Sequence, residues 1–231
     1  MNNDDPYSII RSLRTFLIVS SLMLTYGAMR YFKDRFPNVR EEITEYLIVF
    51  VYLSIPLIVW AIVVFLVLPF LLERPWFRRW LLGSGYIEGY WCEWNREPNG
   101  SGRLSIITIQ PNKSKEYFSI SGEHHDENGA MDKPFRCFPY SFSWPELKYV
   151  YTARQTSKSS EDVEGNGEFV FMAVDGAPQE FGGSYAYGRV GGSAVVRGRR
   201  LTPKEVTEYR RADLRDNLIK RVIKEFVGRE L

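Results

Sequence analysis

Residues 85–94 read GYIEGYWCEW, and the character of the chain changes at this stretch. Its aromatic residues and its alternation of side chains are typical of a β-strand. Tyr90 and Cys92 fall on one face of such a strand, and Trp91 and Glu93 fall on the other. The alternation leaves open which face lines the interior of the fold. The stretch predicts that a β-rich region begins near this point.

Seven further candidate strands follow, each bounded by residues that favour turns, such as the Gly191-Gly192 pair. The eight expected strands are Gly85–Trp94, Arg103–Gln110, Glu116–Gly122, Arg136–Ser143, Leu147–Arg154, Gly167–Val174, Gln179–Val190 and Ser193–Leu201. Eight short strands with tight connections suit an up-and-down antiparallel barrel or a small sandwich. We expect a ligand-binding, eight-stranded β-barrel over residues 81–201.

Upstream of this region the chain is strongly apolar. Residues 46–72 form a run of 27 residues without a charge, and a helix needs about 20 apolar residues to cross a bilayer. A shorter uncharged run, Thr15–Met29, is bracketed by arginines that can reach the lipid headgroups. We therefore expect membrane helices at about 15–31 and 46–72, joined into a two-helix transmembrane hairpin within residues 1–80.

Two further observations bear on the membrane region. A signal peptide is the rival interpretation of the first run, but no A-x-A cleavage site follows it. Five Lys and Arg residues flank the expected helices on the side of the termini, against four in the hairpin loop. This small excess favours a cytoplasmic location for both termini.

The C-terminal segment, residues 202–231, begins with a helix-start signal. Thr202 suits the N-cap, Pro203 the first helical position, and Glu205 the capping-box position. One helix is expected to continue to about Val227. Its apolar stripe consists of Leu214, Leu218, Ile219, Val222, Ile223 and Phe226. We expect this helix to form a lid, to pack on the barrel or to contact a second copy of the chain. A helix that lies on the membrane surface is the alternative.

Composition excludes several classes of function. Lys and Arg total 30 and Asp and Glu total 28, so the net charge is only +2. Proteins that bind nucleic-acid polymers usually carry a clear basic excess, so we expect no such partner. The two cysteines, Cys92 and Cys137, are expected to be free buried thiols.

Recognisable catalytic or metal-binding motifs are absent from the sequence. No serine lies in a nucleophile elbow, and no phosphate-binding glycine loop is present. His124 and His125 are the only histidines, and we expect them in an exposed turn because no other residues have zinc-ligand spacing. The sequence therefore predicts a protein that is not an enzyme and has no metal or cofactor.

Arginines and tyrosines of the late strands are the candidate ligand-binding residues. Arginine can bind two phosphate oxygens at once, and tyrosine rings can stack on bases. The candidate residues are Tyr149, Tyr151, Tyr185, Tyr187, Arg189, Arg197 and Arg199. In the alternative interpretation, these tyrosines form an aromatic barrel wall and the arginines lie on its solvent face.

Gly89-Tyr90-Trp91 resembles the G-x-W motif in the first strand of lipocalins. In that family the tryptophan closes one end of the barrel and packs on an arginine near the last strand. Arg199 or Arg200 is placed to match. The resemblance implies a structural role for whichever of the two contacts the tryptophan.

The arrangement of the whole chain resembles the two-transmembrane, β-strand-rich effectors of CBASS, the bacterial cyclic-oligonucleotide-based anti-phage signalling systems. The resemblance rests on the apolar region at 15–72, the basic aromatic junction Glu73–Trp80, the GYIEGYW stretch and the late Gly/Arg strand Gly191–Leu201. It implies a lipocalin-like barrel in the cytoplasm that binds a cyclic dinucleotide. It further implies oligomerisation on binding, disruption of the inner membrane by the multi-pass anchor, and abortive infection.

Two other functions remain open at this point. One is a membrane-tethered barrel that binds a lipid or another apolar ligand. The other is a non-catalytic assembly protein whose barrel has a filled core and binds only protein.

Overall fold

The computed structural model describes residues 7–35, 54, 58, 60–96, 100–112, 117–153, 163–174, 176–187 and 193–228. Contacts divide the chain into two units, which are Ser8–Leu81 and the combination of Met1–Tyr7 with Leu82–Leu231. Tyr7, directly before the first helix, and the C-terminal helices thus group with the strands.

The first helix, α1, spans Ser8–Arg35 and is longer than the sequence predicts. Within the described part of the chain, its segment Ser8–Gly27 is the one helix long and apolar enough to cross a membrane. A second such span is counted only if the bent pair Trp60–Glu73 and Pro75–Gly85 is taken as one. The link of the expected hairpin, and most of residues 36–59, lie outside the described residues.

The bent pair contains a π-helix, η1 (Val63–Val67), followed by α3 (Leu68–Glu73) and α4 (Pro75–Leu82). The helices on either side of Arg74 are inclined by 94°. Arg74 is extended, with φ −84° and ψ 121°, because the ring of Pro75 disfavours a helical conformation in the residue before it. A short 3-10 helix, η2 (Gly83–Gly85), leads from there into the barrel.

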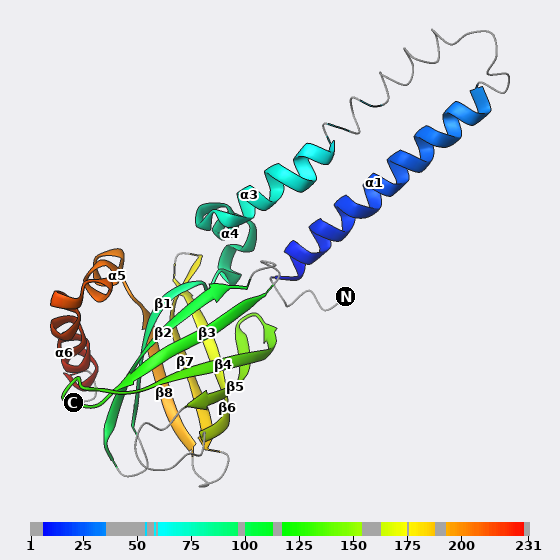
Figure 1. Ribbon diagram of the computed structural model, residues 1–231. Coiled ribbons are helices and arrows are strands. Elements are labelled where there is room, and N and C mark those ends of the chain that lie inside the picture. Colours follow the sequence, from blue (N-terminus) through cyan, green and yellow to red (C-terminus); the bar gives the residue numbers. More distant parts are fainter. Residues whose placement is uncertain are drawn as a thin grey trace. The chain divides into compact units, whose positions relative to one another are not determined.

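Eight antiparallel strands form a closed barrel in which each strand pairs with its neighbours in sequence and β1 pairs with β8 (Figure 1). The strands are β1 (Gly89–Arg96), β2 (Gly102–Pro111), β3 (Phe118–His125), β4 (Met131–Ser143), β5 (Glu146–Ala153), β6 (Val163–Val174), β7 (Ala177–Tyr187) and β8 (Ser193–Arg200). The expected up-and-down barrel is confirmed. Closure leaves no open sheet edge, which would otherwise invite pairing with another chain.

The C-terminal segment contains two helices where the sequence predicts one. These are α5 (Pro203–Arg210) and α6 (Ala212–Gly228), with Arg211 extended between them at φ −96° and ψ 117°. The predicted capping box is present, since the Thr202 hydroxyl accepts from the Glu205 backbone N–H and the Glu205 carboxylate accepts from that of Thr202.

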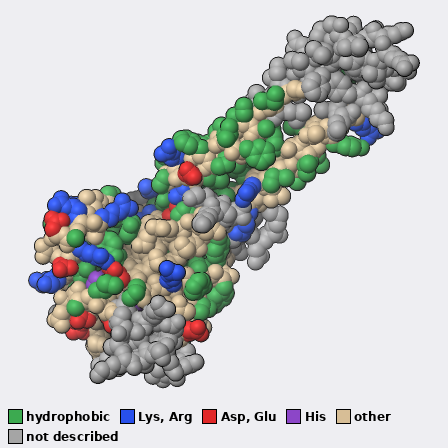
Figure 2. Space-filling view, viewed as in Figure 1, with side chains coloured by type: hydrophobic (Ala, Val, Ile, Leu, Met, Phe, Trp, Pro, Cys, Tyr) green, Lys and Arg blue, Asp and Glu red, His purple; other side chains and the backbone are tan. Residues whose placement is uncertain are grey.

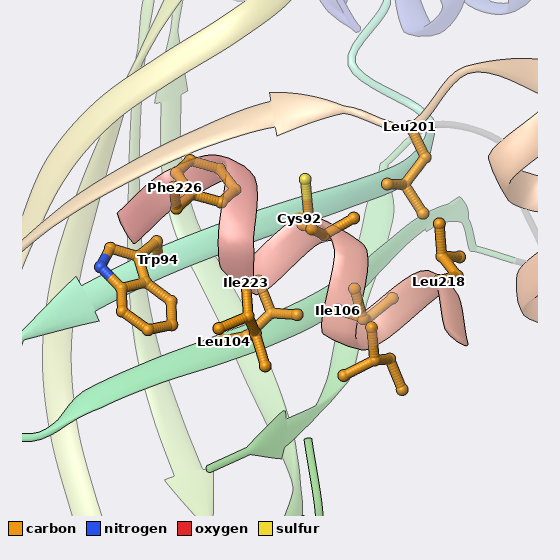
Figure 3. Close-up of a cluster of buried hydrophobic side chains, with 10 residues drawn as sticks. Cys92, Trp94, Leu104, Ile106, Leu201, Leu218, Ile223 and Phe226 are labelled. Carbon is orange, nitrogen blue, oxygen red and sulfur yellow. The ribbon is translucent and has the colours of Figure 1, made fainter. Parts of the chain in front are cut away.

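One cluster of buried apolar side chains joins α6 to the outer face of the barrel (Figure 3). Cys92 and Trp94 of β1 and Leu104 and Ile106 of β2 form its barrel side, together with Leu201. The helix contributes Leu218, Ile219, Val222, Ile223 and Phe226. Both faces of β1 are therefore buried, one under α6 and the other inside the barrel.

Candidate ligand-binding site

The barrel interior holds three of the predicted ligand-binding tyrosines. Tyr149 and Tyr151 of β5 and Tyr185 of β7 are all buried. The Tyr151 and Tyr185 ring centres are 5.7 Å apart, and Tyr149 lies 4.6 Å from the Phe169 ring centre. The structure thus brings these three tyrosines together on the inner face.

Glycines of β6 make room for the tyrosine rings. A Cβ added at Gly165 would lie 2.4 Å from the Tyr151 ring, and one at Gly167 would lie 2.6 Å from the Tyr149 hydroxyl. The rings therefore occupy the space that side chains at these two positions would take. A ligand can enter this level of the barrel only if the rings move.

The structure gives little information on two other predicted ligand residues, Tyr187 and Arg189. The backbone of Tyr187 pairs with Gly165 at the end of β7. The Tyr187 side chain and the whole of Arg189 lie outside the described residues, so their candidacy remains a prediction.

A row of polar side chains crosses the interior from β1 to β3. The Ser105 hydroxyl lies 3.3 Å from a Glu93 carboxylate oxygen and 2.9 Å from His124 Nδ1. The Asn95 amide lies beside Glu93, and its oxygen has no hydrogen-bond partner in the described part of the structure. Burial raises the pKa of Glu93 to about 7, against weaker hydrogen bonds from Asn95 and Ser105. This carboxyl group is thus close to half protonated at neutral pH.

The histidines lie at the end of β3, so the expected exposed turn is wrong for them. His125 is buried, with Nε2 3.1 Å from Glu123 and Nδ1 3.3 Å from the Gly129 carbonyl. Their alternating directions on the strand separate the two rings. No group of three metal-ligating side chains occurs among the residues described. Cys92 and Cys137 are free and buried, as the sequence predicts.

Arg200, rather than Arg199, contacts the tryptophan of the G-x-W motif. Its guanidinium carbon lies 4.9 Å from the Trp91 ring centre, and its Nη2 donates to the Tyr86 and Glu88 carbonyls at 2.9 Å. Trp91 itself donates to the Ile87 carbonyl at 2.8 Å. These bonds hold the segment that enters β1 against one end of the barrel.

Arg197 and Arg199 lie on the outer face of β8, away from the interior tyrosines. Val195, Arg197 and Arg199 alternate there with Ala194, Val196 and Gly198, which are buried on the inner side. The structure therefore separates the candidate arginines from the candidate tyrosines. The pairing of both kinds of side chain in one interior site has no support in this geometry.

The two arginines differ sharply in their surroundings. Arg199 binds Glu205 of α5 at 2.9 Å and Glu225 of α6 at 2.6 Å. Hydrogen bonds to Glu205, and then to Glu225, raise the pKa of Arg199 above its usual range despite desolvation. Burial opposes ionisation of Glu205, yet its bonds to Arg199 and Thr202 lower its pKa to about 2. Arg197 is exposed and makes no ion pair with any residue that the structure describes.

A groove of about 680 Å³ lies over this part of the outer wall. Its lining includes three arginines, Arg96, Arg197 and Arg199, and one acidic residue, Glu180, among the residues described. The register places Arg197 between Trp94 of β1 and Gly182 of β7. A Cβ at Gly182 would meet only one atom, at 4.0 Å, so the missing side chain leaves open space beside Arg197.

Aromatic side chains form one wall of the same groove. The rings of Trp94 and Phe226 are stacked, with centres 6.4 Å apart and planes inclined by 10°. The indole nitrogen of Trp94 is buried and has no hydrogen-bond partner in the described part of the chain. An unpaired buried donor is costly, and a ligand acceptor in the groove would relieve that cost. Arginine side chains, aromatic rings and the unpaired Trp94 N–H therefore lie together at this groove. The sequence does not predict this combination.

A second groove, of about 670 Å³, lies over β2–β5 beside Tyr209. Its lining contains one arginine, Arg136, with the hydroxyl side chains Thr108, Ser121 and Thr152. Glu123 at its edge accepts from Tyr209 at 2.6 Å and from Arg215. This groove has fewer cations than the first and is the weaker candidate for an anionic ligand.

No protein-family model matches this chain, and no curated protein matches its sequence.

Proposed function

We propose that this chain is a membrane-anchored receptor for a cyclic dinucleotide, bound in the groove of Arg96, Arg197 and Arg199. In this proposal the protein is not an enzyme. Ligand binding drives self-association of the chain, and the apolar N-terminal helices then disrupt the bacterial inner membrane during phage infection. This is the role that the resemblance to CBASS effectors implies.

The groove is the observation that carries the proposal. A cyclic dinucleotide presents two phosphodiester charges and two flat bases. Arginine guanidinium groups suit the charges, and aromatic rings suit the bases. Arg197 and the Trp94–Phe226 wall supply both kinds of contact. The volume of about 680 Å³ falls within the range of about 300–1,000 Å³ that small-molecule sites occupy.

The membrane anchor draws support from the surface of α1. Phe16, Leu22 and Met23 are between 65% and 70% exposed, although all three are strongly apolar. Apolar side chains cover much of the visible surface of the helical unit (Figure 2). Exposed apolar area of this extent is unfavourable in water and favourable in hydrocarbon.

Thermal unfolding of the full chain in detergent tests the proposal. We expect one member of a panel of 3′,3′-cyclic dinucleotides to raise the unfolding midpoint by several degrees, since ligand at 100 times its Kd adds about 2.7 kcal/mol. Arg197→Glu should abolish the shift, because it reverses the charge of the exposed cation that is the register partner of Gly182. Arg211→Glu is the matched control, since Arg211 pairs with Asp213 on the C-terminal helices. No shift with any member of the panel would contradict the proposal.

A role as an assembly protein is the second candidate. Phe138, Tyr140 and Val150 are exposed on the outer wall of β4 and β5, where Phe138 and Val150 are register partners. An exposed apolar patch of this kind suits a protein partner. Light scattering distinguishes the two, because an assembly protein associates without ligand and loses association on Phe138→Ser. The described part of the barrel interior does not support a lipid ligand, because the Tyr149 and Tyr151 rings fill the space beside Gly167 and Gly165.

A further inference from the structure

The guanidinium group of Arg199 has no N–H left for a ligand in this structure. Nε and Nη2 donate to Glu225 at 3.2 and 2.6 Å. Nη1 and Nη2 donate to Glu205 at 3.0 and 2.9 Å, and Nη1 also lies 3.2 Å from the Arg200 carbonyl. A guanidinium group binds a phosphate through a pair of neighbouring N–H groups. In Arg199 both such pairs donate to carboxylates, one to Glu225 and one to Glu205.

The two carboxylates differ in exposure and in their place in the helices. The Glu205 side chain is 11% exposed and also accepts bonds from the Thr202 backbone and hydroxyl in the capping box. The Glu225 side chain is 31% exposed and lies near the end of α6, which stops at Gly228. Glu225 can turn toward solvent without breaking a helix cap, whereas Glu205 cannot. An incoming anion therefore displaces Glu225.

We infer that Glu225 is a built-in competitor for the anionic group of the ligand on Arg199, so that it lowers the affinity of the groove for ligands with two negative charges and leaves the affinity for ligands with one unchanged. This inference rests on the proposed function. It adds a specificity-determining residue that does not itself line the groove.

The distribution of charge explains why Glu225 affects only ligands with a second negative charge. Arg197 can bind one phosphate with Glu225 still in place, because it makes no ion pair of its own with a described residue. A second phosphate that binds Arg199 has to replace Glu225 there. It gains only the difference between its own interaction energy with Arg199 and that of the Glu225 carboxylate. A singly charged ligand uses Arg197 alone and does not sense Glu225.

The experiment compares two charge-matched variants of the full chain in detergent. Glu225→Gln removes the competing charge and keeps the shape of the side chain. Glu208→Gln removes one carboxylate from the same pair of helices, where Glu208 binds Arg221. Affinities are measured for the cyclic dinucleotide of the panel that gives the largest thermal shift, and for the 3′,5′-cyclic mononucleotide with the same base.

We expect Glu225→Gln to raise the affinity for the cyclic dinucleotide about fivefold, the size of a lost competing ion pair of partial exposure. It should leave the affinity for the mononucleotide unchanged, and Glu208→Gln should change neither. Unfolding midpoints verify that both variants fold. If the wild type binds the dinucleotide and Glu225→Gln binds it no more tightly, the inference is wrong and the proposed function stands. If no variant binds any probe, the proposed function fails and the inference fails with it.

Discussion

The guanidinium carbon of Arg200 lies 4.9 Å from the centre of the Trp91 ring, where the last strand of the barrel pairs with the first. The same side chain donates to two backbone carbonyls of the segment that enters β1, at Tyr86 and Glu88. The Glu88 carboxylate in turn accepts a 3.2 Å bond from Tyr7, the residue directly before α1. Arg200 thus stabilises the end of the barrel at which the chain arrives from the helical unit.

Arg200→Ala should lower the free energy of unfolding by about 3 kcal/mol. The substitution removes a partly desolvated cation–π contact and leaves the Tyr86 and Glu88 carbonyls, which accept part-buried hydrogen bonds, without this donor. Urea unfolding followed by tryptophan fluorescence measures the change. Arg197→Ala is the control, since Arg197 is exposed and should cost about 0.5 kcal/mol or less. Equal losses in the two variants would show that the Trp91 contact contributes nothing.

Gly198 and Gly182 provide a matched pair on adjacent strands. A Cβ at Gly198 would lie 2.2 Å from the Phe181 ring and 2.7 Å from the Cys92 carbonyl. Gly198→Ala should therefore destabilise the protein by about 1–3 kcal/mol through overpacking. Gly182→Ala should be neutral or slightly stabilising, because its Cβ meets open space and the unfolded chain loses freedom. Thermal unfolding of both variants tests this, and a large loss at Gly182 would contradict it.

Glu93 should make the stability of the barrel depend on pH. Its pKa is about 7 in the folded state against 4.5 for an unperturbed group, so folding favours the protonated form. The stabilisation is complete below about pH 4.5, declines as the pH rises through 7 and is then absent. Glu93→Gln should remove this slope and make the variant more stable than the wild type at pH 8 by about 3 kcal/mol.

Unfolding free energies at several pH values between 4.5 and 8 check the Glu93 prediction. Glu168→Gln is the control, because Glu168 is exposed on the outer face of β6 and should leave the slope intact. A wild-type slope that persists in Glu93→Gln would assign the pH dependence to other groups.

Thr202→Ala should cost about 1 kcal/mol, the usual contribution of an N-cap hydroxyl. The Thr202 hydroxyl accepts the Glu205 backbone N–H at 3.3 Å, and the loss leaves that donor at the helix start unpaired. Thr202→Ser should retain most of the stability, since its hydroxyl can accept the same bond and also donate to the Glu205 carboxylate. Helix content by circular dichroism, together with urea unfolding, measures both. A Ser variant as unstable as the Ala variant would exclude the cap as the cause.

Local signals account for the success of the strand predictions. All eight expected strands exist, and β8 ends within one residue of the position expected. The largest boundary error is in β4, which begins at Met131 rather than Arg136. The sequence predicts a later start because Pro134 lacks the N–H that a ladder needs. In the structure it lies opposite Glu123, close to a register irregularity at His124 and His125 that accommodates it.

Long-range contacts account for the errors in the C-terminal segment and the site. The break at Arg211 is not marked by glycine or proline, and it allows α6 to lay its apolar stripe on β1 and β2. The groove was not predicted because its residues come from β1, β6, β7, β8 and α6, which meet only when the barrel closes. No spacing within one strand could have shown that Arg197 lies beside Trp94 and Phe226.

The number and order of the strands, the capping box and the sets of residues that share a face follow from local sequence, because each depends on neighbours within a few positions. Which face of each strand is inside depends on how the closed barrel and the C-terminal helices pack. Alternation is uninformative for β1, since Trp91 and Glu93 are buried in the barrel while Cys92 and Trp94 are buried under α6. The alternation of side chains across a strand also explains the different roles of Arg199 and Arg200. They are adjacent residues that point to opposite faces, so one binds the carboxylates of the C-terminal helices and the other the ring of Trp91.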